Sequence, residues 1–399
     1  MTLRVSTAQL YQRGIELLQR SQQDLLRTQT QLATQQKLLT AADAPSDWVA
    51  GMGIDQLLAQ TQRYQSNART ALHRLNLEEA ALAEADDVLA RVRELLIQAN
   101  GGSLSAENRG AIAQEITALR DAMLAIANRD DGQGAYLFAG TRDRALPFAW
   151  NGSGADYGGD QQVRRLAIGN ARSIADGDAG SEVFMRLRSG NATTQVSAAS
   201  GNTGSVHVRQ SSVYDATLYD GGTYTIRFSG GGYEVRDAAS TLIDSGPYAA
   251  GTMLRVRGIA LVLDGTPADG DSFTLAPAAQ QDVLALIDKV AQLVDAPRTT
   301  DGERGIAQTG VQQALAELDN AQTHFSTIRA GVGLRLNAAE RAGSTLSAIE
   351  IEAQSALSDL RDVDIAEAAA RLQQQLLALE AAQASFTRVQ GLSLFDYLR

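Results

Sequence analysis

The 399-residue sequence predicts an α+β protein in which both chain ends form a long helical hairpin, a coiled-coil rod, with an inserted β-rich outer domain. Three observations predict this fold class. Apolar residues recur at helical spacing over the first 130 residues and again beyond residue 280. Twenty of the 36 glycines lie between residues 141 and 280, where short alternating runs replace the helical period. The chain therefore folds back at the insert, and its two ends pair with each other.

The last forty residues form a narrow apolar seam. From Ile365 the apolar positions step by four and three residues, as in a coiled coil, and the chain ends in the aromatic stretch 394–398. An apolar chain end needs something to bury it. The residues we expect to form an assembly interface here are Ile365, Leu372, Leu376, Leu379, Phe386, Leu394, Phe395, Tyr397 and Leu398.

The first 45 residues read as one helix with a strict period of seven. The seam residues are Tyr11, Leu18, Leu25, Leu32 and Leu39, and the positions between them are polar. A seam one residue wide buries too little to offset the entropy of ordering, so we expect residues 1–45 and 361–399 to be disordered in the monomer and to form a terminal coiled-coil domain on assembly. The alternative is an ordinary amphipathic helix packed on a globular core.

A helical rod domain is expected from residues 46–140 together with residues 281–360. Pro45 disfavours helix at residue 44, and Ser46 or Asp47 can cap a helix that runs without proline to about residue 100. Glycines then end it, and Ser103 or Ser105 caps the next helix. On the return path, helices are expected from residue 280 and, after a break at 297–305, from residue 306 to 360.

Residues 141–280 form the inserted β-rich outer domain. Residues 223–228 and 233–235 alternate around a turn of three glycines, which is typical of a hairpin, and residues 271–275 read as a closing strand. The polar stretch 189–205 is expected to be a mobile loop or the polar edge of a sheet.

Composition excludes several classes of function. The net charge of −11 argues against a nucleic-acid partner, and the absence of cysteine excludes disulfides and thiolate chemistry. No apolar run reaches the roughly 20 residues of a membrane helix, and the N-terminus lacks a secretory signal peptide. We therefore expect a soluble protein with no membrane partner that does not use the general secretory route.

Residues that carry catalytic chemistry are scarce. His73, His207 and His324 are scattered, and no phosphate-binding loop or nucleophile elbow occurs. Asp176 and Asp178 could hold a cation, but they lack the spacing of a calcium loop. We expect no enzyme, no metal and no cofactor; an outer domain that binds carbohydrate or cleaves peptide is a remaining alternative.

Four stretches resemble the bacterial flagellin superfamily, and more closely its hook-associated protein 3 family of hook–filament junction proteins. They are residues 40–47 at the first joint, 128–141 at the exit into the insert, 265–274 on the return, and 392–398 at the end. The resemblance that they mark extends over roughly residues 1–140 and 260–399. The joint departs from the family's commoner Asp-Asp pairing, because Asp47 is followed by Trp48.

The resemblance implies a structural role. Proteins of this family are exported unfolded by the flagellar secretion apparatus, so a secreted protein located in the flagellum is expected. The implied partners are other copies of the chain, the first hook-associated protein, flagellin, and an export chaperone on the C-terminal coil. A flagellin filament subunit is the alternative within the superfamily, and a non-flagellar coiled-coil scaffold is the alternative outside it.

Overall fold

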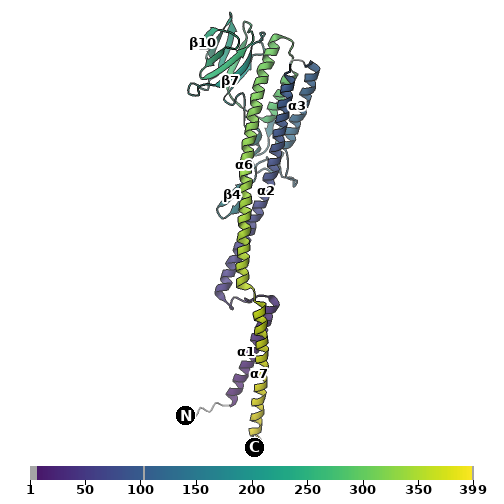
Figure 1. The fold of residues 1–399 in the computed structure, drawn as a ribbon, viewed down its shortest axis with the longest axis vertical. Coiled ribbons are helices and arrows are strands. Elements are labelled where there is room, and N and C mark those ends of the chain that lie inside the picture. Colours follow the sequence, from purple (N-terminus) through teal and green to yellow (C-terminus); the bar gives the residue numbers. More distant parts are fainter. Residues whose placement is uncertain (1–6, 102–103, 398–399) are drawn as a thin grey trace. The chain divides into compact units, whose positions relative to one another are not determined.

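A computed structural model describes residues 7–101 and 104–397 and confirms the α+β fold class (Figure 1). Before the strands lie helices α1 (Thr7–Thr34), α2 (Pro45–Ala99) and α3 (Ala106–Ala127). After them lie α5 (Val283–Asp295), α6 (Asp301–Arg361) and α7 (Ile365–Tyr397). The two long terminal sets of helices therefore enclose a β-rich region in the chain order that the sequence predicts.

The chain divides into two compact units. The terminal unit comprises Met1–Ser66 and Gly343–Arg399, and the central unit comprises Asn67–Ala342. Both units are made from segments far apart in the sequence, and α2 and α6 each contribute to both. The finer division into coiled-coil, rod and outer domains remains a prediction.

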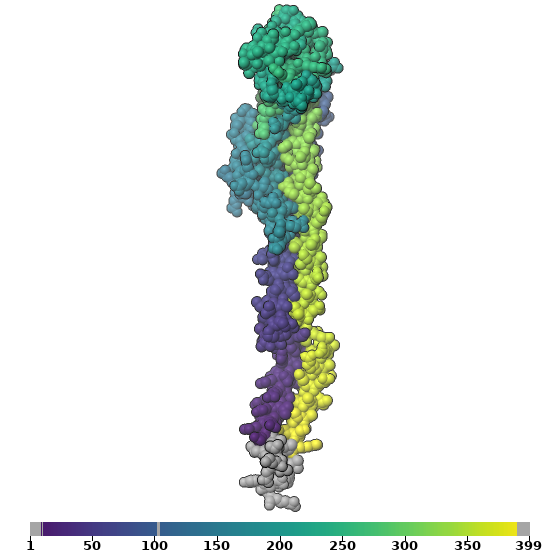
Figure 2. All heavy atoms as spheres, turned by 90° about the vertical axis from the view of Figure 1, so that its left-hand side faces the viewer, coloured from purple at the N-terminus to yellow at the C-terminus, as the bar shows by residue number. Residues whose placement is uncertain are grey.

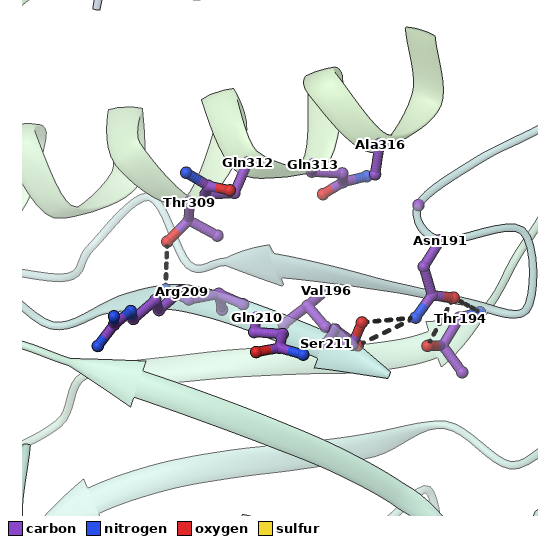
Figure 3. Close-up of a pocket in the computed structure, with 12 residues that line it drawn as sticks. Asn191, Thr194, Val196, Arg209, Gln210, Ser211, Thr309, Gln312, Gln313 and Ala316 are labelled. Atoms are coloured by element: carbon purple, nitrogen blue, oxygen red, sulfur yellow. Dashed lines mark hydrogen bonds between the residues drawn. The ribbon is translucent and has the colours of Figure 1, made fainter. Parts of the chain in front are cut away.

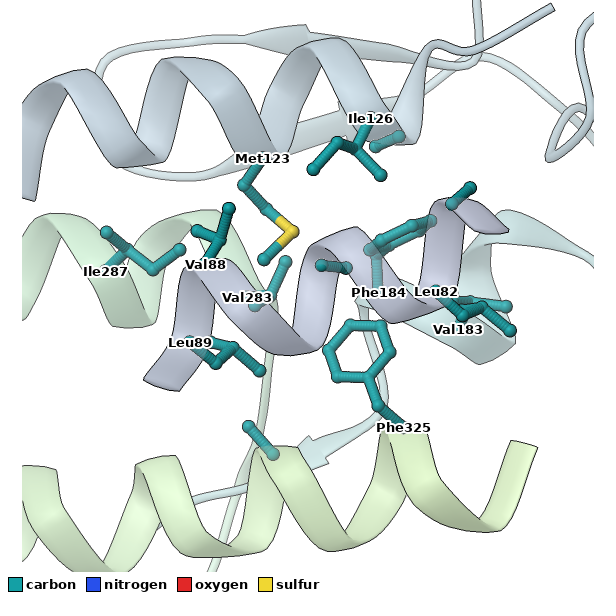
Figure 4. Close-up of a cluster of buried hydrophobic side chains, with 14 of the residues drawn as sticks. Leu82, Val88, Leu89, Met123, Ile126, Val183, Phe184, Val283, Ile287 and Phe325 are labelled. Carbon is teal, nitrogen blue, oxygen red and sulfur yellow. The ribbon is translucent and has the colours of Figure 1, made fainter. Parts of the chain in front are cut away.

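The helical core of the central unit is built from α2, α3, α5 and α6. Leucines of α2, among them Leu82 and Leu89, are fully buried against Met123 of α3 and Ile287 of α5 (Figure 4). Phe184, from the short helix α4 (Gly180–Phe184), joins this core and meets Phe325 of α6 with ring centroids 5.7 Å apart. The β-rich segment thus contributes side chains to the helical core as well as forming its own.

Short polar caps set the ends of these helices. Ser105 accepts the Asn108 N–H at 3.2 Å and starts α3, as the sequence predicts; Ser103 lies outside the described residues. Asp282 accepts the Ala285 N–H at 2.7 Å and starts α5. Each bond satisfies a backbone donor that has no partner within its own helix.

The β-rich region contains paired strands of several small sheets. The first are β1 (Phe148–Trp150) with β2 (Ala155–Tyr157), β3 (Arg165–Gly169) with β4 (Arg172–Ala175), and β5 (Leu187–Arg188) with β14 (Gln280–Gln281). A five-stranded sheet has the order β10 (Leu242–Pro247), β9 (Gly232–Asp237), β8 (Tyr224–Ser229), β13 (Ser272–Pro277), β6 (Thr194–Ala198). A three-stranded sheet has the order β11 (Met253–Val256), β12 (Ile259–Asp264), β7 (His207–Val213).

Three expectations for this region are confirmed. Strands β8 and β9 form the predicted hairpin, and its turn residues Gly230 and Gly231 have φ values of 57° and 77°, which glycine adopts without strain. Strand β13 is the closing strand and pairs with both β8 and β6. Within the polar stretch 189–205, β6 forms the edge of the five-stranded sheet, so the strand-edge interpretation is correct.

The predicted helix over residues 1–45 is wrong at its C-terminal end. Helix α1 stops at Thr34, and Gln35 follows with a φ of 57°, in the left-handed region that ends helices. Leu39, the last residue of the period of seven, therefore lies beyond the helix. The physical reason is a backbone pairing with a segment more than 300 residues away, which the local pattern does not contain.

Two other helix starts also differ from expectation. Pro45 is itself the first residue of α2, a position where its missing N–H costs nothing, so Ser46 and Asp47 lie inside the first turn and are not caps. Helix α6 starts at Asp301 rather than at residue 306. Thr300 and Glu303 bond each other's backbone N–H groups at 3.2 and 3.0 Å, a capping box inside the expected break.

Candidate assembly surface

The joint between the helices of the terminal unit is a short backbone pairing. Gln36 and Asp362 form an antiparallel bridge. On either side of it, the Lys37 N–H donates to the Arg361 carbonyl at 2.6 Å and the Val363 N–H donates to the Gln35 carbonyl at 3.0 Å. The α1–α2 connection is thereby fixed to the α6–α7 connection, so α1 and α7 extend from the same joint.

Asp43 organises the rest of the joint. Its carboxylate accepts the N–H groups of Leu39 and Thr40 at 2.9 and 2.8 Å and pairs with Arg27 of α1 at 2.6 Å. The backbone hydrogen bond from Thr40 is the main cause that lowers the pKa of Asp43, followed by that from Leu39 and the charge of Arg27. Residues 40–44 therefore form a hydrogen-bonded turn between α1 and α2, and the rest of the stretch 40–47 begins α2.

Arg361 at the end of α6 bonds the same joint to α2. Its guanidinium pairs with Asp55 through contacts of 3.1 and 2.5 Å. A Cβ atom on Gly51 would lie only 3.1 Å from Arg361 Nε, so the absence of a side chain there lets the arginine cross the helix surface. Asp364 then caps α7 by accepting the Ala366 N–H at 2.9 Å.

Helices α1 and α7 pack side by side, as expected for paired chain ends (Figures 1 and 2). The rings of Tyr11 and Phe386 lie 5.2 Å apart. Gly14 faces the same ring, and a Cβ atom there would come within 2.9 Å of it. The pairing leaves the seam only partly covered: Leu18, Leu25, Leu32, Leu372, Leu379 and Phe386 are half-buried.

Other predicted interface residues are exposed or lie outside the description. Tyr11, Ile365 and Leu376 are 48%, 57% and 41% exposed, and Leu39 is half-buried in the joint. Leu394, Phe395 and Tyr397 belong to α7, but their side chains lie outside the described part of the chain, as does the whole of Leu398. Whether all these residues share one interface remains a prediction.

Among the side chains that the structure describes, the period of seven missed the most exposed leucines of the terminal helices. Leu17, Leu26 and Leu377 are 63%, 60% and 69% exposed. Each directly adjoins a seam residue, and neighbouring helix positions are about 100° apart, so each faces a different side from its neighbour. The signal was present in the sequence as the three Leu-Leu pairs 17–18, 25–26 and 376–377. We call Leu17, Leu26 and Leu377 the outer leucines.

Several of the histidine and aspartate side chains considered above for catalysis or cation binding form hydrogen bonds or ion pairs within the protein. In the described residues no group of three or more His, Asp or Glu side chains could hold a metal ion. Asp176 pairs with Arg74 and Arg164, and Asp178 pairs with Arg335. His324 Nε2 lies 2.9 Å from the Glu182 carbonyl. Among the described helices, none has the length and apolar character to cross a membrane.

A cavity of about 190 Å³ lies between α6 and strands β6 and β7 (Figure 3). Its polar lining is largely occupied by bonds within the protein. Asn191 donates to the Ser211 carbonyl at 3.1 Å and accepts the Thr194 N–H at 2.8 Å, and Thr309 accepts the Val208 N–H at 3.1 Å. The Thr309 bond joins strand β7 to α6, whereas the two Asn191 bonds lie within the β-rich region.

Helical regions of flagellin type at both ends of one chain define the class of protein. The model of the bacterial flagellin N-terminal helical region matches residues 5–143, and that of the C-terminal helical region matches residues 315–398. Flagellar hook-associated protein 3 of Escherichia coli is 23% identical over 394 residues, which are 99% of each chain.

Solved structures narrow the class to one family. FlgL of Xanthomonas campestris is 35% identical with a TM-score of 0.73, covering 76% of this chain and 99% of that one. The flagellar junction protein FlgL of Legionella pneumophila is 29% identical with a TM-score of 0.71, covering 78% of this chain and 99% of that one. The chain belongs to the family of flagellar hook-associated protein 3, also called FlgL, within the flagellin superfamily.

Proposed function

We propose that the chain forms the junction layer between the first hook-associated protein of the flagellar hook and the flagellin filament. The observation that carries the proposal is the apolar surface of the terminal unit. Most of the large apolar side chains exposed among the described residues belong to this unit, although it is the smaller of the two. A surface of this kind favours burial against further subunits.

The occupant of this surface would be the terminal helices of neighbouring subunits, from other copies of the chain and from the flagellar proteins above and below. The seam leucines pack α1 on α7 within one copy, while the outer leucines face away and are free to pack on a neighbour. Because one copy then presents different surfaces to its lower and upper neighbours, assembly is head-to-tail and does not close on itself.

The same apolar surface supports the proposed export and chaperoning. Helices with half-buried seams are under-stabilised in an isolated copy, so a chain kept unfolded at its ends can pass through the flagellar export apparatus and become secreted. An export chaperone covering α7 would shield Leu376, Leu377 and Phe386 in the cytoplasm until then.

A deletion strain tests the proposed function. Without the chain, we expect cells with complete hooks and no filaments, with flagellin monomers released into the medium, and restored filaments after complementation. Normal filaments in the deletion strain would contradict a junction role. If the chain were instead a filament subunit, its deletion would remove flagellin itself, and the chain would be the dominant band of sheared wild-type flagella. A junction protein, by contrast, is a trace component of sheared flagella.

A further inference from the structure

Glu78 on α2 is a buried carboxyl group at the contact between α2 and the turn after β4. The residue is 2% exposed. Its Oε1 atom accepts the Asp178 N–H at 3.0 Å, whereas its buried Oε2 atom has no hydrogen-bond partner. An unpaired buried oxygen of this kind is costly, and more so if it carries charge.

The charged groups around Glu78 come from four segments of the central unit. They are Arg74 on α2, Asp131 and Asp143 after α3, Arg164, Asp176 and Asp178 around the β3–β4 hairpin, and Arg335 on α6. Arg74 pairs with Asp131 at 3.2 Å and with Asp176 at 3.4 Å. Arg335 pairs with Asp178 and donates to the Gly177 carbonyl at 3.1 Å.

The positive charges of this cluster are already committed to other carboxylates. Asp131, Asp176 and Asp178 each pair with a guanidinium, and Asp143 is 37% exposed to solvent at the rim, 4.0 Å from Arg164. Within the described part of the chain, Glu78 forms no ion pair. An ionised Glu78 would therefore add a buried negative charge next to Asp178, and the positive charge of Arg335 offsets it only in part.

We propose that Glu78 is protonated in the folded chain at neutral pH and that its proton closes a pH-sensitive latch between α2 and the Gly177–Asp178 turn. Protonation turns the unpaired Oε2 atom into a hydrogen-bond donor, with the adjacent Asp178 carboxylate as its acceptor. Burial first, and then the negative charge of Asp178, raise the pKa of Glu78 to about 8. Since Arg335 bonds the same turn to α6, the latch connects both long helices to the β3–β4 hairpin, independently of assembly.

The latch predicts how stability depends on pH. The pKa of Glu78 rises from 4.5 in an unfolded chain to about 8 in the folded one. Between these values the folded chain holds a proton that the unfolded chain has released, so this group makes the folding equilibrium constant fall as pH rises, by up to about tenfold per pH unit. Above a pH of about 8 this contribution becomes constant.

The test is Glu78→Gln in the full-length chain, with unfolding by denaturant followed from pH 5 to 9. Glutamine keeps the shape and supplies a permanent donor, so we expect a weaker pH dependence and a folding constant at least about tenfold above wild type at pH 8. The matched control is Glu79→Gln, because the neighbouring Glu79 side chain is 33% exposed, far more than that of Glu78, and pairs with Arg329 at 2.7 Å. This control should fold less stably and keep the wild-type slope.

A second measurement covers the case in which Glu78→Gln does not fold. Infrared spectra of the folded wild-type chain should contain a protonated-carboxyl band at pH 6 that disappears by pH 9. The proposal is overturned if that band is absent at pH 6. It is also overturned if Glu78→Gln folds and retains the wild-type slope, or loses as much stability as Glu79→Gln at every pH.

Discussion

Glu317 on α6 is fully buried and gathers three donors at one point of the central unit. Its carboxylate pairs with Lys289 of α5 at 2.9 Å, accepts the Gly190 N–H at 3.0 Å, and accepts the Gln313 side chain at 2.7 Å. Gly190 has a φ of 58° and no room for a side chain beside the Thr194 carbonyl. Glu317 of α6 therefore binds Gly190, which precedes the two larger sheets, and also pairs with α5.

We expect Glu317→Leu to destabilise the central unit by about 2–4 kcal/mol, since it removes the carboxylate that accepts the buried Gly190 N–H and pairs with Lys289. The measurement is the free energy of unfolding by denaturant at pH 7. Arg304→Ala is the matched control on the same helix, because Arg304 forms an exposed pair with Asp301 and should change the free energy by less than about 0.5 kcal/mol. Equal losses in both variants would count against the role assigned to Glu317.

At the scale of elements, the terminal helices carry two apolar faces. The outer leucines are more than half exposed, whereas five seam leucines are half-buried where α1 and α7 pack: Leu18, Leu25, Leu32, Leu372 and Leu379. We therefore expect the seam leucines to pair α1 with α7 within one copy and the outer leucines to contact other copies.

Leu26→Asp combined with Leu377→Asp should abolish filament attachment and motility while leaving the monomer's free energy of unfolding within about 0.5 kcal/mol of wild type, because both side chains are exposed in a single copy. The measurements are swimming on soft agar, electron microscopy of the flagella, and unfolding of the purified chain. Leu334→Asp is the control, since Leu334 is 73% exposed on the part of α6 that lies in the central unit. Motility retained by the double variant, or lost equally in the control, would contradict an outer assembly face.

Sequence patterns predicted the elements that depend on local chemistry. The long helices, the glycine-turned hairpin of β8 and β9 and the cap at Ser105 follow from residues close together in the chain. The end of α1 did not, because Thr34 is followed by a bridge from Gln36 to Asp362. The placement of β13 between β8 and β6 is also non-local. The outer leucines were missed because a period of seven selects a single stripe.

At the scale of the whole molecule, burial differs between the two units. Fully buried large side chains such as Leu82 and Phe325 concentrate in the central unit, whereas the heptad leucines of α1 are only half-buried. Polar Thr28 and Gln31 are among the few buried residues of α1. Local stability follows buried apolar contact, so the terminal helices should open far more often than the central ones.

Limited proteolysis of dilute monomer should therefore remove about forty residues from each end and spare the helical core of the central unit. Trypsin offers a matched pair of sites: Arg27 on α1 and Arg304 on α6 are 51% and 52% exposed, and each forms one ion pair with a nearby aspartate. Because their exposure is the same, faster cleavage at Arg27 would report local unfolding of α1 rather than access to the side chain. Mass spectrometry of the fragments over time gives both rates. We expect cleavage at Arg27 and at Arg371 of α7 well before Arg304, whereas equal rates at Arg27 and Arg304 would refute disorder of the terminal helices in the monomer.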